Sequence, residues 1–307
     1  MFSTLPSFII DQGPFEIPGT GVQLTVRRID LIDEITGGNK WYKLKYNILE
    51  AKRLHKNHII TFGGAFSNHI AATAAVCEKA GLHCTGIIRG EADSIKNITL
   101  SRAVASGMKL CFVSRELYRK RNEPEFIDSI LKTDGNEFII PEGGSNNFGM
   151  IGCKEILEKK HDHFNVIAVA AGTGTTAAGL LHALGKDQTL QVINVLRDQD
   201  SILNFIKSHT PEEKWSQLKV FSDYHFGGYA KSDAVLDAFC KSFFQQTAIP
   251  VEPIYTGKLF YGIYDLAQKG IIPAGTKILA IHTGGLQYLS RSEADGSTGT
   301  QIPAGKS

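Results

Sequence analysis

The chain has 307 residues, of which 42% are apolar and 21% charged, a composition typical of a globular protein. Its length exceeds what one hydrophobic core usually sustains, so we expect one large domain or two lobes. The net charge is only +2 and the basic residues are scattered, so the charge pattern does not favour nucleic acid or an anionic membrane as a partner. A small neutral or zwitterionic ligand fits this composition better.

The first residues, "MFSTLPSFIIDQG", lack a basic segment followed by a long apolar run, and no apolar stretch approaches the ~20 residues that a membrane span needs. We therefore expect a cytoplasmic protein. The five cysteines show no C-x-x-C spacing, so the sequence predicts neither a disulfide framework nor a metal site. Buried, reduced thiols are the expected state of these cysteines.

Short apolar runs alternate with helical patterns from about residue 57, which predicts βαβ units around parallel sheets and an α/β fold class. The first unit has a strand near 58–62, a helix near 68–80 that ends at Gly81, and a strand near 84–88. Further strands are expected within 109–114, 137–144, 166–185, 190–196 and 277–285. Further helices are expected near 149–160, near 231–247 and in the second half of 166–185.

Less regular segments separate these units. Residues 142–149, "EGGSNNFG", are typical of a hinge by their glycine content. Residues 197–230 are expected to contain an ordered loop over a site. The C-terminal "SRSEADGSTGTQIPAGKS", residues 290–307, is small, polar and glycine-rich, which predicts a mobile tail.

The loop "GTGTTAAG", residues 172–179, follows a predicted strand and opens a helix. Backbone N–H groups freed by Gly172 and Gly174, together with a helix N-terminus, favour a dianionic phosphate. The hydroxyl groups of the threonines in this loop add donors: Thr173, Thr175 and Thr176. The same stretch satisfies the G-x-G-x-x-A dinucleotide pattern, with Asp198 near the place of a ribose-binding acid. A nicotinamide enzyme is therefore an alternative, as is a turn whose glycines serve only packing.

Polar side chains gather at other predicted strand ends as well. They are Ser67, Asn68 and His69 in "FGGAFSNHIAA", Tyr255 and Thr256 in "PIYTGK", and Thr283 in "IHTGG". Each group alone is typical of a capped turn, and His69 alone of a structural histidine. Because ligands of α/β sheets bind at the carboxyl ends of the strands, the convergence of these groups predicts one common site.

The stretch "TGGNKWYKLKYNILEAK", residues 36–52, places two glycines and an asparagine before Lys40, with Lys43 one helical turn later. Read alone, these lysines are typical of solvated charges on a new helix. An aromatic side chain that can stack on a ring, hydroxyls for a ring nitrogen, a phosphate-binding turn and a lysine after "GGN" together predict pyridoxal phosphate as the cofactor.

The sequence resembles the pyridoxal-phosphate enzymes of the tryptophan synthase β-subunit fold, or fold type II. Within them it is similar to the 1-aminocyclopropane-1-carboxylate deaminase and D-cysteine desulfhydrase family. The matching stretches, in the family's order, are "GGNKWYKL", "FGGAFSNH", "IPEGGSNNFG", "AGTGTTAAG", "DYHFGGYAK", "PIYTGK" and "HTGG". The resemblance implies a homodimer and a two-lobed fold, with a large cofactor-binding domain of residues 1–44 plus 149–307 and a small domain of residues 45–148.

The resemblance also implies the residues that hold the cofactor. Lys40 is expected to form the Schiff base, Lys43 to bind the phosphate, and Asn68 to partner the phenolic oxygen of the ring. The full expected set is Lys40, Lys43, Asn68, Gly172, Thr173, Gly174, Thr175, Thr176, Tyr255, Thr256 and Thr283.

On the substrate side, Ser67 is implied to bind the substrate carboxylate or to move protons. Tyr255 is implied to stack near the ring and to act as acid or base, and Tyr229 is a further active-site tyrosine. The expected catalytic residues are thus Lys40, Ser67, Tyr229 and Tyr255. The expected substrate-binding residues are Ser67, Asn68 and His69.

Thr256 and Thr283 stand where the ring-opening deaminases of the family typically have Glu and Leu, so the chain resembles the desulfhydrase branch. Glu favours a protonated pyridine nitrogen, whereas a neutral hydroxyl leaves that nitrogen neutral and the ring a weaker electron sink. Expelling a thiolate needs less of a sink than breaking a C–C bond. We therefore expect D-cysteine to be converted to pyruvate, sulfide and ammonia.

Some residues depart from the family's pattern. Tyr42 replaces a common Arg, and Phe66 replaces a smaller or amide side chain, which bears on the substrate. Alternatives of the same chemistry are deamination of the cyclopropane substrate, which gives 2-oxobutyrate and ammonia, and elimination from another D- or β-substituted amino acid. Alternatives of another class are a nicotinamide-dependent oxidoreductase and a family member that binds a ligand without turnover.

Overall fold

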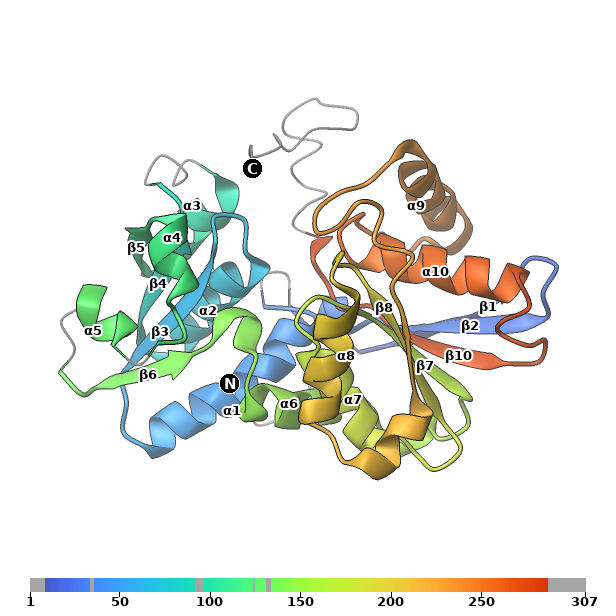
Figure 1. Cartoon of the computed structure of the whole chain (residues 1–307), viewed down its shortest axis with the longest axis horizontal. Helices are drawn as coiled ribbons and strands as arrows, with labels where there is room; N and C mark the ends of the chain where they lie inside the picture. Colours follow the sequence, from blue (N-terminus) through green and yellow to red (C-terminus); the bar gives the residue numbers. More distant parts are fainter. Residues whose placement is uncertain (1–8, 34–35, 92–96, 124, 131–133, 287–307) are drawn as a thin grey trace.

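The computed structural model describes residues 9–33, 36–91, 97–123, 125–130 and 134–286, and the predicted C-terminal tail lies outside them. Two β-sheets with flanking helices lie next to each other (Figure 1). The predicted α/β class with parallel-rich sheets is confirmed. No helix within the described ranges has the length and apolar character that a membrane span requires.

The small sheet has four parallel strands in the order β5-β4-β3-β6. They are β3 (His58–Gly64), β4 (His83–Arg89), β5 (Lys109–Val113) and β6 (Glu137–Ile140). Successive β3 residues point to opposite faces. Ile59 belongs to the core under the first three helices, α1 (Asn39–Arg53), α2 (Asn68–Ala80) and α3 (Ile98–Ala105). Ile60 belongs to the core under α4 (Arg115–Arg119) and α5 (Phe126–Ile130). Because both faces are covered, the five central residues of β3 are all buried.

Among the described residues, the large sheet has six strands in the order β1-β2-β10-β7-β8-β9, in which only β1 and β2 pair antiparallel. They are β1 (Asp11–Ile17), β2 (Val22–Arg27), β7 (Val166–Ala171), β8 (Thr189–Asn194), β9 (Leu218–Phe221) and β10 (Lys277–Ile281). One face is covered by α9 (Ala234–Thr247) and α10 (Thr256–Gln268). The other is covered by α6 (Asn147–Lys154), α7 (Thr175–Ala183) and α8 (Gln199–Ser208).

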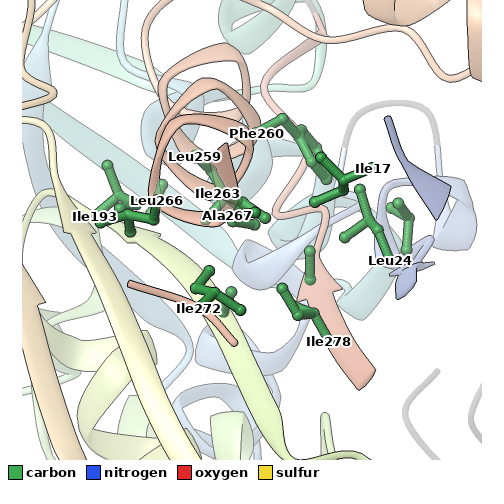
Figure 2. Packing of buried hydrophobic residues seen from close by; sticks show 14 of the residues in the cluster. Ile17, Leu24, Ile193, Leu259, Phe260, Ile263, Leu266, Ala267, Ile272 and Ile278 are labelled. Carbon is green, nitrogen blue, oxygen red and sulfur yellow. The ribbon is translucent and has the colours of Figure 1, made fainter. Parts of the chain in front are cut away.

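Helix α10 is fixed to the large sheet by an apolar stripe. Figure 2 shows Leu259, Ile263 and Leu266 of this helix packed near Ile193 of β8, and each of the four is at most 1% exposed. Full burial of such a side chain stabilises the fold by about 1.5–3 kcal/mol. The position of Tyr255, which directly precedes α10, follows from this packing.

Helix α1 connects the cores of the two sheets. Its first turn places Trp41 and Tyr42 in the core below the large sheet, whereas Leu44 and Ile48 belong to the core of the small sheet. Lys40 and Lys43 are therefore carried to the junction of the two sheets. Short 3-10 helices complete the described structure: η1 (Ile29–Ile32), η3 (Glu142–Gly144), η4 (Lys159–His161) and η5 (Glu212–Gln217).

The predicted unit of strand, helix and strand from residue 58 to 88 is confirmed, with Gly81 in the left-handed conformation at the end of α2. Two predicted helix bounds differ from the structure. The helix predicted near 149–160 is α6, which ends at Lys154, and the separate helix η4 follows. The helix predicted near 231–247 begins only at Ala234, because the Asp233 carboxylate accepts the N–H of Leu236 at 2.9 Å and so caps α9 there.

The segment 197–230 contains α8, η5 and β9, and Asp198 caps α8. The predicted hinge at 142–149 forms η3 and the start of α6.

Candidate active site

A cavity of about 440 Å³ lies where the start of α1, the turn after β7, the start of α2, Tyr255 and the residues after β10 meet. Most of the predicted site residues line it: Lys40, Lys43, Asn68, Gly172, Thr173, Gly174, Thr176, Tyr255 and Thr283. The other predicted residues are not part of its described wall: Ser67, His69, Thr175, Tyr229 and Thr256. The convergence of strand ends expected from the sequence is therefore present.

The glycines before Lys40 allow the chain to pass the end of β10. Gly38 has φ +75°, and a Cβ atom on it would lie 2.0 Å from the carbonyl oxygen of Thr283. The N–H of Asn39 donates to the same carbonyl at 3.2 Å. Only glycine permits this crossing, and the crossing places Lys40 next to Thr283 in the cavity wall.

Lys40 is the second residue of α1, and its Nζ donates to the side-chain oxygen of Asn39 at 3.2 Å. Burial, followed by the positive charge of Lys43, lowers the pKa of the Lys40 ammonium to about 7. A large fraction of this side chain is thus a neutral amine near neutral pH, the form that acts as a nucleophile.

Lys43 lies one helical turn further on and is 3% exposed. Its Nζ donates to the carbonyl oxygen of Gly143 at 3.2 Å and to the hydroxyl of Thr173 at 3.4 Å. Within the described part of the chain, no carboxylate lies within salt-bridge distance of Lys40 or Lys43. A buried lysine with only neutral partners favours an anion beside it, and Lys43 offers this next to the Lys40 amine.

The turn after β7 holds its hydroxyl groups in a defined arrangement. Gly174 has φ +82° and precedes the first residue of α7, so the free N–H groups of that helix point toward the cavity end of the turn. Thr176 accepts a hydrogen bond from the side-chain amide of Asn39 at 2.9 Å. Thr175 is fully buried, and its hydroxyl is 2.7 Å from that of Ser145. Thr173 and Thr176 line the cavity, whereas Thr175 is not part of its described wall and has its hydroxyl 3.1 Å from that of Thr173.

Asp198, the candidate ribose-binding acid, serves as a helix cap. Its carboxylate accepts the N–H groups of Asp200 and Ser201, each at 3.1 Å. Both bonds belong to the start of α8, so the residue has a structural partner in the fold.

The turn after β3 brings a different set of groups. Ser67 caps α2, with its hydroxyl accepting the N–H of Ile70 at 3.4 Å. Asn68 lines the cavity. His69 is 2% exposed, with Nε2 2.8 Å from the hydroxyl of Thr61, and burial holds the pKa of its ring well below the usual range. Its Nδ1 has no hydrogen-bond partner among the described residues. His69 is thus a neutral, buried ring behind the cavity wall.

Tyr255 and Tyr229 form an aromatic pair beside the cavity. Their ring centroids are 5.9 Å apart and the planes meet at 68°, an edge-to-face contact. Gly172 leaves room for this pair, because a Cβ atom there would lie 3.1 Å from the Tyr255 ring. Burial raises the pKa of the Tyr255 hydroxyl well above its ordinary value, so this phenol stays protonated.

Thr256 is fully buried, and its hydroxyl donates to the carboxylate of Glu252 at 3.2 Å. The same carboxylate accepts the N–H groups of Ile254, Tyr255 and Thr256 at 2.6 to 3.2 Å. Burial raises the pKa of Glu252 to about 7, although these donors favour its charged form. The sequence reasoning missed Glu252, for which the signal is an acid four residues before the first residue of a helix.

The residues of the cavity fit pyridoxal phosphate. Lys43, Thr173, Thr176 and the first N–H groups of α7 form a donor set suited to a phosphate. Lys40 is a nucleophilic amine in the same cavity. Asn68 offers an amide to a ring oxygen, and Thr283 a hydroxyl to a ring nitrogen. Every polar group that the cofactor carries has a chemically suitable partner here.

Comparisons with known proteins agree with this fit. The family model described as "Pyridoxal-phosphate dependent enzyme" matches residues 16–284. A Pyrococcus horikoshii protein with the provisional name 1-aminocyclopropane-1-carboxylate deaminase is 30% identical over 288 residues, which cover 87% of this chain and 85% of that protein. A D-cysteine desulfhydrase of Serratia proteamaculans is 28% identical, with 88% of each chain covered.

Solved structures are similar as well. The crystal structure of a homologue of 1-aminocyclopropane-1-carboxylate deaminase superposes with a TM-score of 0.75 at 28% identity, over 94% of each chain. Maize serine racemase, at 14% identity, shares the fold with a TM-score of 0.66 over 94% of this chain and 92% of that one. With a cavity that suits the cofactor and a family model that spans most of its length, the chain belongs to the pyridoxal-phosphate dependent enzymes of fold type II, among relatives named as 1-aminocyclopropane-1-carboxylate deaminases and D-cysteine desulfhydrases.

Proposed function

We propose that the protein eliminates the β-substituent of a small amino acid, and that D-cysteine and water are converted to pyruvate, sulfide and ammonia. The observation that carries this proposal is the pair of neutral threonines, Thr256 and Thr283, at positions where ring-opening deaminases typically have Glu and Leu. Thr283 lines the cavity, and the hydroxyl of Thr256 is bonded to Glu252.

Bound pyridoxal phosphate supplies an electron sink for the carbanion at the α-carbon. Lys40 would attach the cofactor through its Nζ. When the Nζ is free, it would hold the α-proton of the substrate. Its lowered pKa supports both roles, because the amine is available near neutral pH. Lys43, Thr173 and Thr176 would hold the phosphate, and Asn68 the ring oxygen.

The substrate would lie between the small sheet and Tyr255. We propose that Ser67 binds the substrate carboxylate, with the positive end of α2 adding to the attraction. The protonated phenol of Tyr255 would donate a proton, and Tyr229 beside it would accept or return one. His69 would act from behind Asn68 by shaping this turn, since its ring is buried.

The first experiment is an assay of pyruvate release from a panel of amino acids. D-cysteine, L-cysteine, D-serine and 3-chloro-D-alanine are compared at equal concentrations, together with an assay of 2-oxobutyrate from 1-aminocyclopropane-1-carboxylate. We expect the highest kcat/KM with D-cysteine. Turnover of the cyclopropane substrate above D-cysteine would overturn the proposed substrate and leave the cofactor chemistry standing.

Ring-opening deamination is the second candidate, because several similar proteins carry that name, some of them provisionally. The substitutions Thr256→Glu and Thr283→Leu, made together, test which positions decide between the two reactions. We expect the ratio of cyclopropane to D-cysteine turnover to rise. An unchanged ratio would show that these positions do not divide the two activities.

We also propose that the chain divides into a large domain of residues 1–44 plus 149–307 and a small domain of residues 45–148. The passage of α1 from one core to the other supports this division. A homodimer in the cytoplasm is the proposed state of the enzyme, and sedimentation analysis of the purified protein tests the dimer.

A further inference from the structure

The loop at residues 225–230, between β9 and α9, has an unusual backbone. Phe226 and Ala230 have φ values of +51° and +55°, and Gly227 and Gly228 have +88° and +114°. For residues with a side chain this conformation costs about 1–3 kcal/mol each, and it persists only where the surroundings hold it. Tyr229 is part of this loop.

Lys258 of α10 is hydrogen-bonded to the backbone of this loop. Its side chain is fully buried, and its Nζ donates to the carbonyl oxygens of His225 and Gly228, both at 2.8 Å. Within the described ranges, no carboxylate lies within salt-bridge distance of this ammonium. Burial lowers the pKa of Lys258 to about 8, and the charge of Glu252 opposes that shift.

A buried ammonium with two neutral acceptors is a costly arrangement, because desolvation disfavours the charge. Lys258 gives no charge to the cavity, since it is not part of the described cavity wall. Its contacts go instead to the backbone on both sides of Phe226 and Gly227. The loop is thus tied to α10 at two points three residues apart.

Helix α10 also carries Tyr255 at its N-cap, one turn before Lys258. Tyr229 follows Gly228, whose carbonyl Lys258 binds, and contacts the ring of Tyr255. The Tyr229 side chain is 52% exposed, so packing alone fixes it weakly. One helix therefore supports both tyrosines, Tyr255 directly and Tyr229 through the loop.

We propose that Lys258 is a positioning residue whose ammonium clamps the loop at residues 225–230 to α10 and thereby holds Tyr229 against Tyr255. The functional half of this inference rests on the proposed roles of the two tyrosines. The clamp itself is a property of the folded chain and can be measured without turnover.

The clamp is tested by hydrogen exchange of the backbone amides in residues 225–231, followed by mass spectrometry. Lys258→Met removes the donor, and Lys269→Met is the control, since Lys269 is the C-cap residue of the same helix, with its side chain 60% exposed and paired with Asp265. We expect about 10-fold faster exchange in the loop for Lys258→Met and no change for the control. Unchanged exchange in Lys258→Met overturns the clamp. Lys258→Gln is the milder variant, with the same expected direction, should the methionine variant fold poorly.

The link to the tyrosines is tested by a double-mutant cycle with Tyr229→Phe. In the unaltered protein this substitution should change the near-ultraviolet circular dichroism, because it removes the phenol of an ordered ring. In the Lys258→Met background it should change little. Lys258→Met alone should lower kcat about 10- to 100-fold, and by less than about 2-fold once Tyr229 is Phe. Lys258→Arg, which keeps the cation, should recover part of the loss.

Additive effects of the two substitutions on dichroism and on kcat would show that Lys258 does not act through Tyr229, and would overturn the link. If the protein turns over no amino acid, the proposed function fails, whereas exchange and dichroism still decide on the clamp and on the tyrosine contact. The two failures are therefore distinguishable.

Discussion

The turn after β7 and the turn after β3 both lead from a parallel strand into a helix, yet they hold their polar groups differently. In the first, Thr173, Thr175 and Thr176 bond to side chains of Lys43, Ser145 and Asn39. In the second, Phe66 is 52% exposed and the Ser67 hydroxyl accepts one long bond from its own helix. A rigid, cross-linked turn suits a cofactor that stays bound, whereas a less constrained turn suits a substrate that comes and goes.

The largest effect is expected for Lys40, which lines the cavity together with residues of both turns. Lys40→Ala should remove the visible absorption of bound cofactor that borohydride bleaches in the unaltered protein, and should lower turnover by about 10³-fold or more. Lys45→Ala is the control, because Lys45 lies on the same helix, binds Glu155 and is not part of the described cavity wall. A borohydride-sensitive band that persists in Lys40→Ala would place the anchor elsewhere.

Lys43→Met tests the turn after β7. The substitution removes a charged donor to the proposed phosphate, so cofactor affinity should fall about 10- to 100-fold, which corresponds to about 1.5–3 kcal/mol. Equilibrium dialysis of the apoprotein with cofactor measures it. A changed KM for the substrate at unchanged cofactor affinity would contradict the assignment of the cofactor to the turn after β7 and of the substrate to the turn after β3.

The pH dependence of cofactor attachment tests the same difference between the cofactor-binding residues and the turn after β3. The reactive form of Lys40 is the neutral amine, and its pKa is lowered to about 7, so the rate of attachment to the apoprotein should rise with pH with a midpoint at about 7. His69 on the other turn has its pKa well below 6.5 and should add no step in this range. In Lys43→Met the midpoint should move to higher pH, because the charge of Lys43 is one cause of the lowered value. A midpoint that moves down would contradict this electrostatic account.

The smallest effect is expected for Ser67→Ala. Loss of the cap should destabilise the fold by about 1 kcal/mol, raise KM for the amino acid and leave cofactor affinity within about 2-fold. Asn97→Ala is the matched control, since Asn97 caps α3 with a 2.9 Å bond from the N–H of Leu100 and does not line the described cavity. It should lower the stability to unfolding by a similar amount without changing KM. Equal KM values in the two variants would show that Ser67 does not bind the substrate.

Much of the fold was predictable because its signals are local. The short, mostly apolar run of β3, the cap at Ser67 and the left-handed Gly81 act within a few residues, and the corresponding elements are confirmed. The segment 197–230 was harder to predict, because the edge strand β9 is only four residues long and pairs with β8 alone. Its strand character depends on a partner that is distant in sequence.

The sequence by itself determined where the glycine turns, helix starts and candidate lysines lie, since backbone conformation and capping depend on near neighbours. Only the tertiary structure decided which hydroxyls face the cavity. Thr175 and Thr176 are adjacent and chemically alike, yet one bonds to Ser145 and the other to Asn39, 137 positions away. The tertiary structure likewise decided that Thr256 donates to Glu252 and that Lys258 donates to the loop at residues 225–230. Both are buried polar groups, which must find hydrogen-bond partners within the fold.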